Sequence, residues 1–185
     1  MIRVEDIGAD RLERVNKILS RVPGGAIRAS YAAMKRAGQT AKTKAGQFAA
    51  AEYTISKGTF MANVNMKTDM SGGAGGVASL NLLFAGAVLP LKTFQVRASR
   101  TGGVVAKVKR SGGGGRLEHA FRVDAFGGGI FERVGAPRFP VEQKYGPSTA
   151  HMMQDEKVVQ QMDKTITETF DKRIEHEIMR ILNGG

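Results

Sequence analysis

The spacing of hydrophobic residues changes twice along this chain, and the changes divide its 185 residues into three parts. Over residues 9–62 and again over 148–182, apolar residues recur every three or four positions, which is typical of amphipathic helices. Over residues 63–141 they alternate with polar residues, as they do in half-buried strands. Helices, then strands, then a helix predict an α+β fold, with an antiparallel sheet of about five to six strands in a single domain spanning residues 1–185.

The final helix is the element that the sequence predicts most clearly. One apolar stripe follows it at helical spacing, and Asn183-Gly184 ends it. The members of the stripe are Val159, Met162, Ile166, Phe170, Ile174, Ile178 and Leu182. We expect this stripe to be part of the core.

Three helices are expected before the strands. Asp10 and Glu13 resemble a capping box at the start of the first helix, and Pro23-Gly24-Gly25 ends it. The second helix is expected from about Ala26 to Tyr53, and Ser56 is placed to cap a short third helix that ends near Ala62. The expected apolar face of the second helix consists of Ile27, Tyr31, Met34, Ala41, Ala45 and Phe48.

Alternating apolar residues and glycine clusters mark the expected strands and their connections. Glycine-rich loops are expected at residues 72–76 and 112–115. The expected strands cover residues 64–70, 78–84, 94–96, 104–108, 120–126 and 130–134, followed by a short extended piece at 139–141.

The chain has a formal net charge of +11, and this charge is unevenly distributed. Two windows, Arg14–Ala51 and Met70–Leu117, contain no Asp or Glu. Unbalanced positive charge repels itself unless an anionic partner is nearby, so one interpretation is a surface that faces nucleic acid or an acidic protein. The other interpretation is a solvated basic face with no specific partner, and the sequence leaves both open.

No residue pattern in the sequence indicates catalysis. The segment Gly73–Ala78 matches a dinucleotide-binding fingerprint, but it precedes a predicted strand instead of opening a helix. His119, His151 and His176 lack metal-binding spacing, and the absence of cysteine excludes disulfides and thiolate sites. The longest apolar stretch, Leu80–Leu91, is far too short to span a bilayer. We therefore expect a protein that is not an enzyme, with no catalytic, cofactor-binding or metal-binding residues, no cofactor and no membrane contact.

Several segments of the strand region resemble a known protein family. They are Leu89–Phe94, Gly103–Val108, Ala120-Phe121, Ile130–Arg133 and Phe139–Ser148, of which the last is the most specific. With the basic N-terminal helix and the long C-terminal helix, they resemble the minor tail protein Z, or tail completion, family of tailed bacteriophages. The resemblance covers roughly residues 21–182.

The resemblance implies a structural protein at the head-proximal end of the tail, which completes the tail and makes it competent for head–tail joining. It implies a homo-oligomeric ring, with sixfold symmetry favoured because it suits the tail tube. The implied neighbours are the tail terminator or tail tube protein and the head–tail connector, with phage DNA in the lumen. The implied location is the virion, in the tail or neck, after assembly in the host cytoplasm. The alternative is a basic domain that binds nucleic acid without sequence specificity, although aromatic residues for base stacking are scarce.

Seven cations are candidates for facing DNA or a protein partner. They are Arg28, Lys35, Lys42 and Lys44 in the second helix, and Lys107, Lys109 and Arg110 at the end of a strand beside the glycine-rich loop. In a ring, this loop could carry the second group of cations toward the axis.

The motif Tyr145-Gly146-Pro147 is expected to have a structural role. Its residue types predict a sharp turn at or just before the start of the final helix. Pro140 and Pro147 bracket a stiff extended segment, so we expect this region to fix the helix against the sheet and not to bind a ligand.

Overall fold

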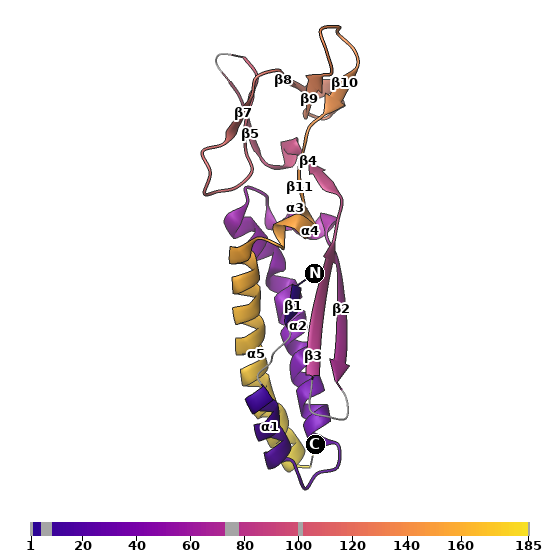
Figure 1. The fold of residues 1–185 in the computed structure, drawn as a ribbon, viewed down its shortest axis with the longest axis vertical. Helices are drawn as coiled ribbons and strands as arrows, with labels where there is room; N and C mark the ends of the chain where they lie inside the picture. The colour runs from indigo at the N-terminus through magenta and orange to yellow at the C-terminus, as the bar shows by residue number, and fades with distance from the viewer. Residues whose placement is uncertain (1, 5–8, 73–77, 100–101, 185) are drawn as a thin grey trace. The chain divides into compact units, whose positions relative to one another are not determined.

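Helices and antiparallel strands make up the computed structural model, which describes residues 2–4, 9–72, 78–99 and 102–184 (Figure 1). The predicted α+β class is confirmed. The helices are α1 (Ala9–Ile18), α2 (Gly25–Glu52), α3 (Lys57–Asn63), α4 (Thr149–Met152) and α5 (Glu156–Leu182), with short 3₁₀ helices η1 (Leu91–Thr93) and η2 (Asp124–Phe126). The strands are β1 (Ile2–Val4), β2 (Asn65–Gly72), β3 (Ala78–Ala85), β4 (Val88–Pro90), β5 (Gln95–Ala98), β6 (Val104–Lys107), β7 (Gly115–Leu117), β8 (Ala120–Val123), β9 (Gly129–Arg133), β10 (Val141–Gln143) and β11 (Tyr145–Ser148).

The chain divides into two compact units. The first unit consists of residues 1–45, 66–84 and 156–185, and the second consists of residues 46–65 and 85–155. The first contains most of the helical sequence and strands β1 to β3, and the second contains strands β4 to β11.

The described strands form four small antiparallel sheets, so the expectation of one sheet with five to six strands is wrong. The first unit has the order β1-β3-β2, and the second has β5-β6-β7, β10-β9-β8 and β11-β4. Glycines account for the short strands of the second unit: Gly102 and Gly103 precede β6, Gly127 and Gly128 precede β9, and all four have positive φ. Glycine adopts this backbone conformation without strain, so it permits reversal of the chain after a few residues.

Helix α2 buries a row of alanines on the face that packs in the first unit. Ala29, Ala33, Ala37, Ala41 and Ala45 follow one another at intervals of four residues, and all have 0% exposed surface. Of the expected apolar face, Met34, Ala41 and Ala45 are buried, whereas Ile27 and Tyr31 are 52% and 47% exposed. The prediction of the buried face is therefore partly wrong, because the helix uses small side chains that allow neighbouring elements to approach closely.

Gly38 shows how close this approach is. A methyl group at Gly38 would lie 3.3 Å from Leu80 Cδ1 and 3.6 Å from Thr68 Cγ2, so strands β2 and β3 pack directly on α2. Leu80 and Leu82 of β3 are fully buried, as their alternating spacing predicts. The strand expectation for this part of the chain is confirmed, with β1 added at the edge of β3.

Helix α5 buries the predicted stripe in its middle. Met162, Ile166, Phe170, Ile174 and Ile178 are buried, but Leu182 at the end of the predicted stripe is 52% exposed. At the two ends of the stripe, Val158 is buried instead of Val159, and Ile181 is buried instead of Leu182. The expectation of one helix over 148–182 is also wrong, since Ser148 caps the short α4 and α5 begins only at Glu156.

Two ion pairs join α1 to α5 within the first unit. Arg11 Nε lies 2.9 Å from Asp171 Oδ1, and Arg14 Nη1 lies 3.0 Å from Glu175 Oε1. The helix begins at Ala9, so Asp10 lies inside its first turn, and the side chain of Asp10 is outside the described part of the chain. All four side chains of these ion pairs are substantially exposed, so the pairs add little stability.

The segment Tyr145-Gly146-Pro147 forms part of strand β11, so the predicted sharp turn is wrong. Tyr145 pairs with Pro90 and Ser148 with Val88 of β4, with a register irregularity between them. Gly146 has no positive φ, and a methyl group there would collide with the ring of Phe94, which is 5% exposed. Close packing on a buried aromatic ring, not turn geometry, therefore requires glycine at this position.

An extended segment after Pro140 links two of the small sheets. Val141–Gln143 pairs with β9, the Lys144 N–H donates to Ile130 O at 2.8 Å, and the Leu91 N–H donates to Lys144 O at 2.9 Å. Pro140 itself is exposed and follows a cis peptide bond, and its carbonyl accepts from the Val134 N–H at 3.1 Å. The expected extended segment between Pro140 and Pro147 is therefore present, and it contributes strands to two different sheets.

Candidate functional site

The predicted cations of α2 do not form one continuous group. Arg28, Lys35 and Lys42 follow one another at heptad spacing, which places them on one side of the helix, and Lys44 lies on a different side. Arg28, Lys35 and Lys44 are exposed. Lys42 is half-buried and donates a hydrogen bond from Nζ to Met66 O of β2 at 3.3 Å, so this cation contributes to packing within the first unit.

Lys109 belongs to a compact polar cluster in the second unit. Its Nζ lies 2.6 Å from Asp155 Oδ2 and 5.6 Å from the centre of the Tyr53 ring. The Tyr53 hydroxyl donates to the same carboxylate oxygen at 3.3 Å, and the Asp155 side chain is only 9% exposed. The hydrogen bond to Asp155 raises the pKa of Lys109, and burial is the main cause that raises the pKa of Tyr53. Lys109 therefore makes structural contacts within the second unit.

Arg110 completes the C-terminal end of α2. The last carbonyls of a helix have no partner within the helix, and cations at this end also oppose its dipole. Arg110 donates from Nε to Ala50 O and from its backbone N–H to Glu52 O, both at 2.8 Å. Lys109 and Arg110, two of the three cations predicted beside the glycine-rich loop, therefore both make contacts inside the second unit.

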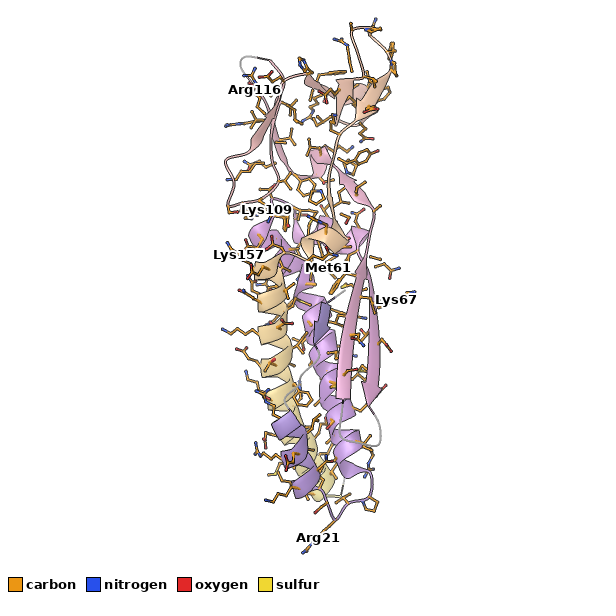
Figure 2. The ribbon with its side chains drawn as sticks, viewed as in Figure 1. Arg21, Met61, Lys67, Lys109, Arg116 and Lys157 are labelled. Atoms are coloured by element: carbon orange, nitrogen blue, oxygen red, sulfur yellow. The ribbon has the colours of Figure 1, made fainter. Side chains whose placement is uncertain are left out.

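Lys107 lies apart from these two cations, on one face of the sheet β5-β6-β7. Directly paired residues of neighbouring strands point to the same face. The pairs Gln95↔Lys107, Arg97↔Val105 and Val105↔Arg116 therefore place all five side chains together. We call these five residues, Gln95, Arg97, Val105, Lys107 and Arg116, the basic sheet face. Figure 2 labels Arg116, on the β7 side of this sheet, separately from Lys109.

The two faces of this sheet differ in character. The opposite face carries Val104 and Ala106, which are 3% and 8% exposed and belong to the core of the second unit. The basic sheet face is hollowed, with a volume of about 230 Å³ lined by Gln95, Arg97, Val105, Lys107 and Gly113. One face of the sheet is therefore buried in the core, and the other face carries mainly polar and charged side chains.

Arg97 and Lys107 make no ion pair in the described part of the chain. Arg116 donates from Nη2 to Gly102 O at 3.3 Å. The sheet lies in the acid-free window of the sequence, so its own strands supply no carboxylate. The result is a hollow with hydrogen-bond donors and positive charge on its walls.

Lys107 was predicted from the sequence as a candidate residue, but its position on the same sheet face as Arg97 and Arg116 was not predicted. The missing signal was the register of the β5–β6 hairpin, in which Gln95 pairs with Lys107 and Ala98 with Val104. Counting outward from Gly102-Gly103 as a two-residue turn would place Arg97 opposite Val108, so the glycine pair does not predict the observed register, in which Arg97 pairs with Val105 and is diagonal to Lys107.

Two larger hollows occur in the second unit. One, of about 590 Å³, is lined by the glycine-rich loop together with Lys109 and Lys144, and the other, of about 690 Å³, includes His119, Glu132 and Arg133. Lys144 pairs with Glu132, and this hydrogen bond raises the pKa of Lys144. In the described residues, no group of three or more His, Asp or Glu side chains is placed to hold a metal ion.

Comparisons of the chain with models of known protein families, with curated proteins and with solved structures find no match. Within the described residues, none of the helices combines the length and apolar character needed to cross a membrane.

Proposed function

We propose that this protein is a non-enzymatic structural component of a tailed bacteriophage, acting as a ring at the head-proximal end of the tail. It completes the tail and makes it competent for joining to the head, with the tail terminator or tail tube protein and the head–tail connector as neighbours. The observation that carries the proposal is the number of open strand edges in the second unit. The sequence resemblance supplies the particular place in the virion.

The open edges follow from the sheet orders. Among the strands described in the second unit, β6 and β9 have partners on both sides, whereas β4, β5, β7, β8, β10 and β11 each have one open side. Open edges carry unpaired N–H and C=O groups that invite pairing with another chain, and sheets of two or three strands gain stability from being covered. Neighbouring copies in a closed ring would supply this cover.

Exposed apolar side chains occur on or near several of these strands. Val88, Phe126, Val134, Phe139 and Tyr145 are all more than half exposed. They lie on or beside β4, η2, β9, β10 and β11. Large exposed apolar side chains are a common feature of surfaces that contact other proteins.

The test is the mass of the purified protein by light scattering and native mass spectrometry over a range of concentrations. We expect a species with six times the mass of the 19.9 kDa chain at high concentration. The variant Val88→Lys with Phe139→Lys should shift it toward the monomer without changing the far-ultraviolet circular dichroism.

The matched control is Ile27→Lys, which adds charge at a similarly exposed apolar residue of α2 and should leave the ring intact. A protein that stays monomeric at every concentration, and makes no self-contact in assembled particles, would refute the ring.

A further inference from the structure

We propose that the basic sheet face binds the backbone phosphates of double-stranded DNA without reading base sequence. The proposal rests on the register and charge of the sheet β5-β6-β7 alone. It names the surface through which a nucleic acid contacts the protein, and it does not require the ring of the proposed function.

The arrangement of the cations suits a row of phosphates. Arg97, Lys107 and Arg116 come from three adjacent strands, and neighbouring strands lie about 4.8 Å apart. The Arg97 guanidinium group can offer two parallel N–H donors to a phosphate, and Lys107, diagonal to Arg97 on the neighbouring strand, adds a point charge. The Gln95 amide supplies a further donor at the edge of the same hollow.

The surrounding residues favour phosphate over an acidic protein. Protein interfaces have an apolar centre rich in aromatic residues, whereas the only apolar side chain on the basic sheet face is the half-buried Val105. Gly113 at the rim has no side chain, so an extended anionic chain can approach the hollow closely there.

The composition of the face also distinguishes duplex from single-stranded nucleic acid. Proteins that hold single strands stack bases on aromatic side chains, and the basic sheet face has none. Contacts to phosphate alone fix a protein on a duplex but carry no sequence information. We therefore expect similar affinity for duplexes of different sequence.

Binding of duplex DNA by these cations should depend on salt concentration. Each phosphate neutralised by a cation contributes about −0.9 to the slope of log K against log salt concentration on duplex DNA. Contacts from Arg97 and Lys107 give a contribution of about −1.8, which corresponds to an affinity loss of about 12-fold between about 50 and 200 mM NaCl.

The test is fluorescence anisotropy of the full chain with a labelled duplex of about 30 base pairs of mixed sequence, over that range of NaCl. The variant Arg97→Gln with Lys107→Gln should bind more weakly and make the slope less steep by about 2. The single variant Arg97→Gln should make the slope less steep by about 1. Circular dichroism should show that each variant is folded. The matched control, Lys172→Gln with Arg173→Gln, likewise removes one Lys and one Arg, both exposed on α5, and should leave the slope nearly unchanged.

Three results would overturn the inference: no duplex binding at about 50 mM NaCl, equal slope changes in the double variant and its control, or preferential binding of single strands. Native mass spectrometry of the same variants separates this inference from the proposed function. Loss of DNA binding with an unchanged oligomer supports the basic sheet face, whereas loss of the oligomer with an unchanged slope bears on the ring alone.

Discussion

The substitution Gly146→Ala tests the packing of β11 on the buried ring of Phe94. Gly146 is in an extended strand, and its new methyl group would overlap the Phe94 ring, with Cδ2 at 3.0 Å and Cζ at 3.1 Å. Because Phe94 is 5% exposed, its ring has little room to move. Overpacking of this kind costs about 1–3 kcal/mol, and for a chain of this size each kcal/mol lowers Tm by about 2–4 °C.

A double-mutant cycle measured by urea denaturation gives the decisive comparison. Phe94→Leu removes the edge of the ring that meets the new methyl group, so Gly146→Ala should cost at least about 1 kcal/mol less in the Phe94→Leu background. Gly115→Ala is the matched control, since a methyl group there meets nothing within 4 Å. The effect of this control should stay within about 0.5 kcal/mol. If Gly146→Ala costs the same in both backgrounds, contact with Phe94 is not the reason for glycine at this position.

Three further substitutions in α5 test the first unit. Phe170 is fully buried, whereas Met179 of the same helix is 62% exposed. Phe170→Ala should therefore lower the free energy of unfolding by about 3–5 kcal/mol. Met179→Ala should change it by about 0.5 kcal/mol at most. Unchanged stability of Phe170→Ala with failed assembly would instead make Phe170 an interface residue. Asp163→Asn should raise Tm at neutral pH, because burial raises the pKa of Asp163 and its Oδ1 has no hydrogen-bond partner among the residues that the structure describes. The carboxylate weakens folding above the raised pKa. The gain should vanish well below pH 3.8, the ordinary pKa, where the folded and unfolded states are both protonated. An equal gain at both pH values would contradict this cause.

The predictable parts of the fold are those set by local spacing. The stripe from Met162 to Ile178 has helical periodicity, and Ser56 caps α3 by accepting from the Thr59 N–H at 3.0 Å, both as the sequence indicates. The buried face of α2 was less predictable because alanine is small enough to suit either environment. Its burial depends on how closely β2 and β3 approach at Gly38, which is a property of the tertiary structure.

Long-range pairing explains the remaining differences. Tyr145-Gly146-Pro147 has residue types that favour a turn, but its pairing with β4, a strand far away in the sequence, holds it extended. Lys107, Lys109 and Arg110 are close in sequence, yet β6 ends at Lys107 and the next residues contact the C-terminal end of α2. Neighbouring cations therefore have different surroundings, and only Lys107 joins the basic sheet face.

Electron microscopy of assembled phage particles, with an affinity label at the C-terminus of this chain, tests the central proposal most directly. The account predicts labelled density that forms a ring where the tail meets the head, and tails made without the chain should fail to join heads. Particles that lack the label, or carry it away from the head-proximal end of the tail, would contradict the proposal.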